Sequence, residues 1–313
     1  MISWIKFCPL FVFYTAQIHA AALDKSGQSI RAFLEEGNYI EVSVGQVQSD
    51  ITGDIPQRET LVEAGVTDFS TSNLVPASIL TQTALKLQLH PKISVGLIYD
   101  QPFGAKVGYQ MYQPDSAQNT LLESTYFNLQ TESLSFLLGF QPTISWNFFT
   151  GLIYQTLDAK IQLQGKTFSL FDGYEAYISK DHAFGGVFGL SYQIPEYSLK
   201  STLSYHSKIR YQPTIEESIT GQSLNFSPTV SSKIETPQSV NIDLQTAISS
   251  RTLLYGALRW VDWSKFSIQP TQFDHITASI LTLLDLEQDI NLIHYEHDQW
   301  STNVGIAHQL SDQ

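Results

Sequence analysis

Connections of two very different lengths alternate along this chain, and this restricts the fold more than any other feature of the sequence. Apolar and polar residues alternate with period two in many segments, which is the pattern of a β-strand. The predicted strands are 39–47, 79–90, 93–101, 131–140, 144–157, 182–193, 197–211, 236–248, 252–263, 289–296 and 300–309. Short turns such as 90–92 alternate with long polar segments such as 102–130. This asymmetry is typical of an all-β, transmembrane antiparallel barrel.

The segments 236–248 and 252–263 show the strand pattern most clearly. In the first, Val240 and Ile242 fall on one face, and Asn241 and Asp243 fall on the other. One reading is a soluble sandwich with one solvated face. The other is a barrel whose polar face lines a lumen and whose apolar face meets lipid. Because a sandwich gives no reason for strictly alternating loop lengths, the barrel is favoured.

The first residues predict export from the cytoplasm. Lys6 precedes a short apolar run, 7–14, and small residues follow around Ala20. This pattern predicts a cleaved signal peptide over 1–22, and the apolar run is too short to span a bilayer as a helix. The only cysteine, Cys8, lies inside it. The mature chain is therefore expected to need no disulfide and to offer no thiolate.

Composition excludes two other classes of protein. A net charge of −13 opposes binding to nucleic acid, whose phosphates it would repel. After the N-terminal segment, no stretch approaches the roughly 18 apolar residues that a membrane-spanning helix needs. Yet 18 Phe and 15 Tyr stand against only 17 Lys and Arg together. This balance is typical of a Gram-negative outer-membrane barrel, in which the apolar band is spread over alternate residues.

Three motifs carry a family resemblance. They are Leu23-Asp24-Lys25-Ser26-Gly27-Gln28-Ser29, the segment Gly96-Leu97-Ile98-Tyr99-Asp100-Gln101-Pro102-Phe103-Gly104, and a third that joins Thr236-Pro237-Gln238-Ser239 to Arg259-Trp260-Val261-Asp262-Trp263. Together they resemble the FadL/TodX family of outer-membrane transporters for long-chain fatty acids and aromatic hydrocarbons. The residues that mark the family are Asp100, Pro102, Gly104, Pro237, Gln238, Ser239, Trp260 and Trp263.

The resemblance implies a barrel of about fourteen strands over 39–313, with an N-terminal hatch over 23–38 folded into its lumen. It implies passive uptake of long-chain fatty acids or other hydrophobic small molecules, with no enzyme activity and no cofactor. The expected surroundings are outer-membrane lipid, lipopolysaccharide and the barrel-assembly machinery. Only about eleven strands are visible and the last is expected to run outward, which predicts either a form truncated by about three strands or an error in the strand count.

The hatch itself is expected to be helical. Ile30, Phe33 and Leu34 form an i, i+3, i+4 stripe, Asp24 or Ser26 is placed to cap the helix, and Gly37 to end it. The list of expected substrate-binding residues is Phe33, Leu34, Phe103 and Arg259. Phe33 and Leu34 would form an apolar wall of the channel, and Phe103 would mark an apolar entry on the outside.

Arg259 is charged in mid-strand and should face the lumen, because a lipid-facing arginine costs about 2–4 kcal/mol. There it would attract a fatty-acid carboxylate or form an internal salt bridge with Asp243. Trp260 and Trp263 are expected in an interfacial aromatic girdle.

No motif predicts catalysis or a metal site. His294, Glu296 and His297 read as solvated residues at a strand end, because a metal needs further convergent ligands. A calcium site is likewise disfavoured for the acidic loop residues, which are Asp50, Asp54, Glu59, Glu63, Glu216 and Glu217. The alternatives for function are a general porin, a surface-binding or adhesion barrel, and a non-functional truncated family member.

Overall fold

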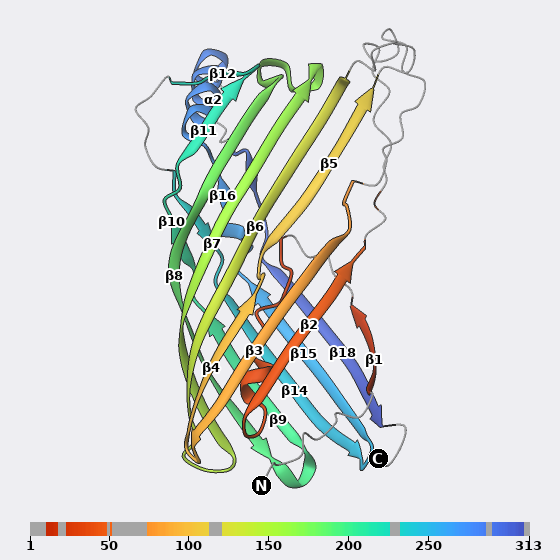
Figure 1. Ribbon diagram of the computed structural model, residues 1–313. Coiled ribbons are helices and arrows are strands. Elements are labelled where there is room, and N and C mark those ends of the chain that lie inside the picture. Colours follow the sequence, from red (N-terminus) through yellow and green to blue (C-terminus); the bar gives the residue numbers. More distant parts are fainter. Residues whose placement is uncertain are drawn as a thin grey trace.

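A single large antiparallel sheet, curled into a half-barrel, dominates the computed structural model, which describes residues 11–17, 23–48, 51, 74–112, 121–225, 232–285 and 290–309 (Figure 1). The strand order is β1-β18-β15-β14-β9-β8-β7-β6-β4-β3-β2, with β5 paired to β6. The strands of the wall are β1 (Phe11–Gln17), β2 (Tyr39–Val47), β3 (Ser78–His90), β4 (Ile93–Asp100), β5 (Gly104–Tyr112), β6 (Leu121–Phe140), β7 (Trp146–Gly165), β8 (Tyr174–Ile194), β9 (Leu199–His206), β14 (Ser239–Ser249), β15 (Thr252–Val261) and β18 (Gln299–Gln309).

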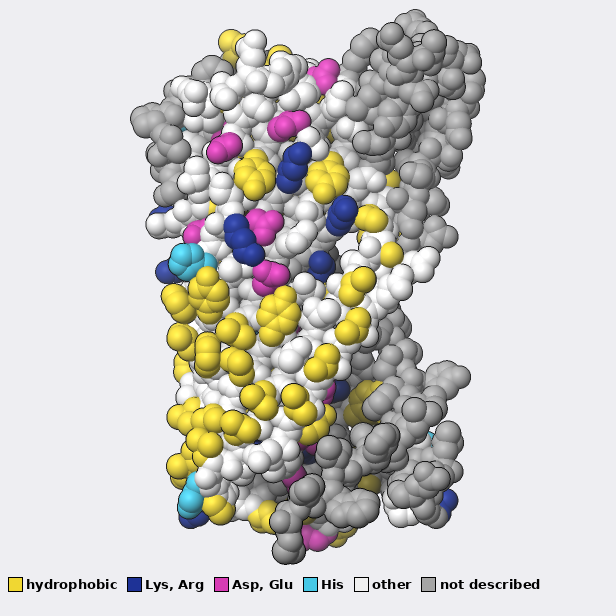
Figure 2. Space-filling model, in the orientation of Figure 1, with side chains coloured by type: hydrophobic (Ala, Val, Ile, Leu, Met, Phe, Trp, Pro, Cys, Tyr) yellow, Lys and Arg dark blue, Asp and Glu magenta, His cyan; other side chains and the backbone are white. Residues whose placement is uncertain are grey.

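The period-two pattern places an apolar band on the outside of this wall. Large apolar side chains gather over the lower halves of the strands seen in Figure 2, and charged side chains lie above them. The band contains Phe136, Leu138, Phe140, Leu152, Phe184 and Phe188, all at least half exposed. The charged side chains above it include the ion pair of Lys180 Nζ with Glu132 Oε2, at 2.9 Å. A belt of this kind suits contact with lipid rather than with water.

Most predicted strands are present, but three are much longer than predicted. The segments 131–140 and 182–193 lie within β6 and β8, and 144–157 overlaps β7 from Trp146 on; the three strands have 20, 21 and 20 residues. Their upper halves still alternate, with Leu157, Ala159 and Ile161 buried in β7. The residues between them are polar, and the composition of this upper half therefore resembles that of a loop. β5 was not predicted at all.

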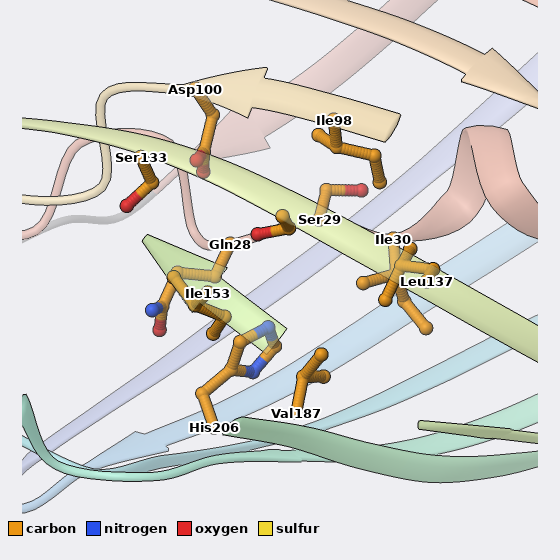
Figure 3. A pocket seen from close by; sticks show the side chains of 11 residues that line it. Gln28, Ser29, Ile30, Ile98, Asp100, Ser133, Leu137, Ile153, Val187 and His206 are labelled. Atoms are coloured by element: carbon orange, nitrogen blue, oxygen red, sulfur yellow. The ribbon is translucent and has the colours of Figure 1, made fainter. Parts of the chain in front are cut away.

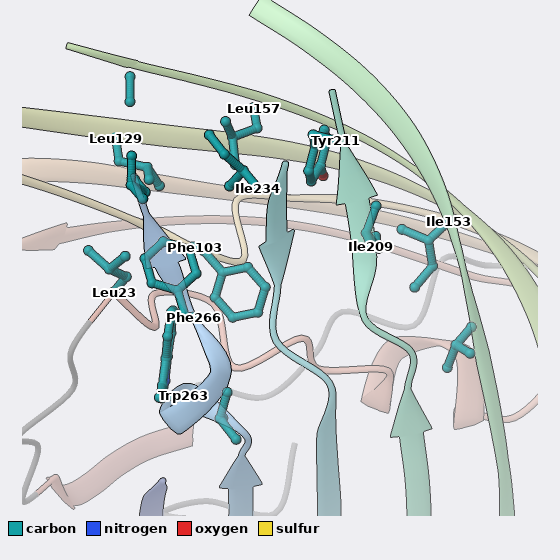
Figure 4. Packing of buried hydrophobic residues seen from close by; sticks show 14 of the residues in the cluster. Leu23, Phe103, Leu129, Ile153, Leu157, Ile209, Tyr211, Ile234, Trp263 and Phe266 are labelled. Carbon is teal, nitrogen blue, oxygen red and sulfur yellow. The ribbon is translucent and has the colours of Figure 1, made fainter. Parts of the chain in front are cut away.

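Two predicted strands are each broken in two. The segment 197–211 divides into β9 and β10 (Ile209–Tyr211), and 236–248 into β13 (Ile234–Thr236) and β14. β10 pairs with β13 as a separate two-stranded ribbon. The break before β14 falls at Pro237, which has no N–H to give to a ladder. The ribbon turns its buried side toward the upper core, where Tyr211 and Ile234 pack near Leu157 and Phe103 (Figure 4).

The predicted strand 289–296 was wrong. Only β17 (Ile293–His294) forms there, and it pairs with β16 (Ser267–Ile268) inside the long connection between β15 and β18. That connection also holds α2 (Thr271–Leu284). Because 289–296 does not cross the wall, β18 runs toward the short turns, not outward as predicted (Figure 1).

The remaining elements lie around the upper opening. β11 (Ile215–Ile219) pairs with the start of β8 and with β12 (Gln222–Ser223). Short 3₁₀ turns are η1 (Arg31–Leu34), η2 (Lys166–Phe171), η3 (Pro195–Tyr197) and η4 (Trp263–Lys265). Within the described ranges, no helix is long and apolar enough to cross a membrane.

Glu217 attaches α2 to the wall. Its carboxylate accepts the backbone N–H groups of Gln272 and Phe273, both at 2.8 Å, and the Tyr174 hydroxyl at 2.9 Å. These N–H groups belong to the first turn of α2, where no intrahelical acceptor exists and negative charge is favourable. The prediction that Glu217 is a solvated loop residue was therefore wrong, because it lies in β11 and its side chain is buried against the first turn of α2.

Candidate functional site

The N-terminal segment lies inside the half-barrel, as a hatch would, but it is not the predicted helix. Only η1 is helical, because Gly27 and Gln28 have φ of +66° and +52°, which an α-helix does not allow. Asp24 and Ser26 do not cap a helix and instead bond to the wall. The predicted apolar stripe is present, since Ile30, Phe33 and Leu34 are all buried. We call residues 23–38 the hatch.

Arg259 is the centre of a polar network that holds the hatch. Its Nε and Nη2 atoms donate to the two carboxylate oxygens of Asp24, at 2.6 and 3.2 Å. The three other donor directions reach oxygens of Gln28, Ser239 and Asn241, at 3.0, 3.1 and 2.7 Å. All five guanidinium N–H groups are thus used, and both charged side chains are less than a tenth exposed. We call these five residues the Arg259 network.

The alternative pairing of Arg259 with Asp243 was wrong. Asp243 Oδ1 instead accepts Arg31 Nη2 of the hatch at 2.6 Å, and the Arg31 guanidinium is about half exposed. Both charged pairs therefore join the wall to the hatch. Sequence reasoning missed Arg31 because nothing local shows which carboxylate it faces 212 residues away.

The motif at the end of β4 meets the same segment. Ser26 Oγ donates to Asp100 Oδ2 at 2.6 Å, and Lys25 N donates to Pro102 O at 2.8 Å. Gly104 N in turn donates to Leu23 O at 2.7 Å. These bonds fill the interruption between β4 and β5, where the wall strand leaves its ladder. The three sequence motifs therefore converge on one contact between wall and hatch.

Phe33 anchors the lower side of the hatch by packing. Its ring lies edge-on to Phe149, with centroids 6.3 Å apart. It also covers Gly96 and Gly139, where a Cβ atom would come within 2.4 and 3.0 Å of the ring. The glycines leave the space that the ring fills. Phe33 thus packs against the wall, as does the buried Leu34 beside it.

Backbone carbonyls close the lower end of the hatch. Lys200 Nζ donates to Leu34 O at 3.0 Å, and Lys86 Nζ donates to Glu35 O. Both lysines point inward from wall strands, so their ammonium groups contact carbonyl oxygens of the hatch and stay out of the apolar band.

Phe103 and Trp263 lie together in the upper core. Their rings meet edge to face with centroids 5.4 Å apart, and they are 2% and 1% exposed. The prediction that Trp263 belongs to an interfacial girdle was wrong, because the chain folds inward after β15. Trp260 stays partly exposed on β15 and donates from Nε1 to Asp298 Oδ2 at 3.0 Å.

The Gln238 side chain, just before β14, links the strands on either side of β14. It accepts the Tyr205 hydroxyl at 2.9 Å and donates to Asp262 Oδ2 at 2.8 Å. With Pro237 at the strand break and Ser239 in the Arg259 network, the Pro-Gln-Ser motif ties β14 to both of its neighbours.

A cavity of about 600 Å³ lies above the hatch. Its polar lining includes Asp24, Lys25, Arg31, Asp243 and Arg259. Its apolar lining includes Val47, Ile51, Leu80, Val107 and Leu258. A volume of this size and mixed lining fits a small amphiphilic ligand.

Lys25 is the group in this cavity that sequence reasoning missed. Its ammonium has no hydrogen-bond or ion-pair partner among the residues that the structure describes, and burial lowers its pKa. Gly104 allows the close approach, because a Cβ there would lie 2.9 Å from Lys25 Nζ. A half-buried cation without a counter-ion is suited to receive an anion.

A second and far smaller pocket lies between the hatch and the wall strands. It has room for about one water molecule, about 10 Å³, and lies between Gln28, Asp100, Ile153 and His206 (Figure 3). His206 Nδ1 is buried there without a hydrogen-bond partner in the described ranges. The hatch thus separates the upper cavity from this small space.

Among the described residues, no three of His, Cys, Asp and Glu come together as a metal site would require. His294 belongs to β17 and is exposed, as are Glu296 and His297. Asp50, Asp54, Glu59 and Glu63 lie outside the described residues.

Comparison with known proteins finds the same architecture elsewhere. The chain matches no family model and no curated protein sequence. It resembles a Pseudomonas aeruginosa FadL homologue with TM-score 0.53 and 13% identity, over 88% of this chain and 68% of that one. The Ralstonia pickettii toluene transporter TbuX gives 0.53 and 12%, over 89% and 75%. The Pseudomonas putida toluene transporter TodX gives 0.51 and 14%, over 90% and 73%. The chain therefore has the fold of the FadL/TodX outer-membrane channels over about nine tenths of its length.

Proposed function

We propose that this protein is a passive outer-membrane channel for hydrophobic compounds, gated by the hatch. The fold shared with transport channels, the outer apolar band and the hatch inside the wall support this proposal. It includes the predicted export by a cleaved signal over 1–22. The ligand would enter the cavity above the hatch, and movement of the hatch would open the route onward, with a lateral exit through the barrel wall. Burial of an alkyl chain would supply about 0.8 kcal/mol per CH₂.

We further propose that the preferred ligands are hydrophobic acids such as long-chain fatty acids. The observation that carries this is Lys25, a half-buried ammonium without a counter-ion in a cavity whose other side is apolar. Arg259 does not serve this purpose with the hatch in place, because Asp24, Gln28, Ser239 and Asn241 use all of its donors. A carboxylate at Lys25 would form a charge-assisted bond worth about 1.5–3 kcal/mol.

Uptake of matched ligands tests the proposal. Cells that lack their own transporter would be given a labelled long-chain fatty acid or its methyl ester, which differs only in charge. Outer-membrane insertion is checked first by heat-modifiable gel mobility. The native chain should take up both, and Lys25→Gln should lower acid uptake about tenfold while leaving ester uptake nearly unchanged.

Lys92→Gln is the matched control, because this exposed lysine lies in the short turn between β3 and β4, far from the cavity. It should change neither rate. Equal losses of acid and ester uptake in Lys25→Gln would contradict the role of the charge. A folded, inserted chain that takes up neither compound would contradict the channel itself.

A further inference from the structure

A cavity of about 700 Å³ interrupts the wall beside β8. The ladder of β8 with β9 ends at Val187, and its ladder with β11 begins at Ile178. Between these points the described chain forms only isolated bonds to this edge, such as that from Ser179 N to Thr214 O at 3.0 Å. We call this cavity the notch. Its lining residues are Asp181, His182, Arg210, Tyr211, Gln212, Lys233 and Glu235.

The notch opens on the outer surface of the wall. The ribbon of β10 and β13 lies along it and turns Tyr211 and Ile234 toward the core, where both are at most 1% exposed. Alternate residues of a strand point to opposite faces. Arg210 accordingly points outward, and its side chain is 67% exposed. On β8, the exposed His182 lies beside Tyr154, with ring centroids 5.6 Å apart.

The height of the notch is that of lipid headgroups. Phe184 and Phe188 of the apolar band follow His182 on the outward face of β8 and are 60% and 54% exposed. Figure 2 shows a histidine and cationic side chains immediately above the hydrophobic ones at the left of the wall. An open strand edge is tolerated at this level, because polar groups are available there. The long connections lie on this side, which is the outer face of such barrels.

The ribbon carries more positive than negative charge at the notch. Lys208 Nζ and Arg210 Nε both contact the carboxylate of Glu235, at 3.1 and 2.6 Å, so two cations share one anion. The two Nη atoms of Arg210 have no hydrogen-bond partner among the described residues. Lys233 is exposed and has no ion-pair partner there either. The cations therefore keep donors that Glu235 does not use.

The second carboxylate of the notch is occupied by the backbone. Asp181 Oδ2 accepts the N–H of Gln212 at 2.9 Å, and its Oδ1 accepts the N–H of His182 at 2.8 Å. Asp181 thus joins the edge of β8 to the end of β10, and the free guanidinium and ammonium donors stay available. Arg and Lys donors of this kind are suited to phosphate oxygens, which accept charge-assisted bonds.

We propose that the notch is a binding site for a phosphate of lipid A, the phosphorylated membrane anchor of lipopolysaccharide. Arg210 and Lys233 would hold the phosphate, and the acyl chains would run down the outer wall over Phe184 and Phe188. The bound headgroup would cover the open edge of β8 at the membrane surface. The proposal rests on the proposed outer-membrane location, and it is independent of the compound carried through the channel.

Titration of the purified full chain with lipid A tests the site. The chain would be held in detergent micelles, its folding checked by heat-modifiable gel mobility, and bound lipid counted by native mass spectrometry. Arg210→Gln combined with Lys233→Gln should weaken lipid A binding at least about tenfold, because both charge-assisted contacts are lost. Both side chains are exposed, so the fold should tolerate the change.

Lys106→Gln combined with Lys160→Gln is the matched control. These lysines remove the same charge from outward positions of β5 and β7 above the apolar band, outside the notch. Their loss should change lipid A binding by less than about twofold. Equal losses in the two double variants would overturn the proposal, because a general attraction to basic side chains would then explain the binding.

Two further probes separate the lipid from its parts. Dephosphorylated lipid A should bind at least about tenfold more weakly than lipid A, and equal binding would show that the phosphate is not recognised. Inorganic phosphate in millimolar excess should not displace lipid A, and full displacement would show a site for the free anion instead. A chain that transports hydrophobic compounds but binds no lipid A would overturn the notch as a lipid site while leaving the channel intact.

Discussion

Replacing Arg259 by glutamine should release the hatch from the wall. The side chain is 8% exposed and its partner Asp24 is 7% exposed, so removing the cation leaves a buried carboxylate without its counter-ion. Such a loss costs about 3–5 kcal/mol. Glutamine restores one or two of the hydrogen bonds, which lowers the expected cost to about 3 kcal/mol. Because 1.36 kcal/mol is a factor of ten, the opening equilibrium should rise by about 100-fold.

Thiol labelling measures this opening directly. Ala32 is 4% exposed within the hatch, and Ala32→Cys in the Cys8→Ala background changes its size little. When closing is faster than labelling, the rate of reaction with a maleimide is proportional to the open population. The rate in denaturant, measured for each variant, corrects for the reactivity of the thiol itself. The Arg259→Gln variant should label about 100-fold faster than its parent.

Arg31→Gln is the matched control, because it removes the same charge from the other pair between hatch and wall. Its guanidinium is 47% exposed, so solvent screens the interaction with Asp243 and the expected loss is about 0.5 kcal/mol. Labelling should then rise only about twofold. Equal labelling rates in the two variants, or less than about a fivefold increase in Arg259→Gln, would refute the conclusion that the Arg259 network holds the hatch against the wall.

Three further outcomes follow from other contacts. Gly104→Ala should lower the thermal midpoint, because its Cβ would lie 2.6 Å from Leu129 O, whereas Gly45→Ala, with nothing within 4 Å, should not. Glu217→Ala should increase proteolysis of the connection that holds α2, since two helix N–H groups and a tyrosine hydroxyl lose their acceptor. Lys25→Met should stabilise the fold at neutral pH. Burial lowers the pKa of Lys25, so the charged lysine destabilises the folded state below its folded pKa, and this destabilisation vanishes above pH 10.5. The denaturant midpoints of the native chain and the variant should therefore converge above pH 10.5.

The wall could be predicted because its signal is local. Alternation of side chains fixes which face of a strand is apolar, so β2, β3 and β15 were found within one or two residues. The same reasoning correctly predicted that the Arg259 side chain faces the interior of the wall. It failed above the apolar band, where Lys160 and Asp158 face outward between buried residues and the composition resembles a loop. Only the period, not the polarity, distinguishes such a strand.

The hatch could be predicted only in part, because its conformation depends on distant partners. The stripe of Ile30 and Phe33 gave its buried side, but positive φ at Gln28 is set by bonds to Ser239 and Arg259, 211 and 231 residues away. The choice of partner for Arg259 is of the same kind. Asp243 is close in the sheet, yet Asp24 completes a bidentate geometry that a neighbour in the sheet does not provide.

The hatch is held differently on its two sides, and in the proposed channel this difference would connect ligand binding to opening of the hatch. Below, Phe33 is fixed by packing, which no ligand in the upper cavity touches. Above, Lys25 stands next to Asp24, the carboxylate that engages Arg259. An anion drawn to Lys25 would add a like charge beside Asp24 and offer Arg259 a second acceptor. Such a ligand would weaken the closed state more than a neutral one of the same size, and by linkage release of the hatch would strengthen its binding. In the proposed channel, this arrangement would let the ligand itself favour opening of the hatch, without an energy source.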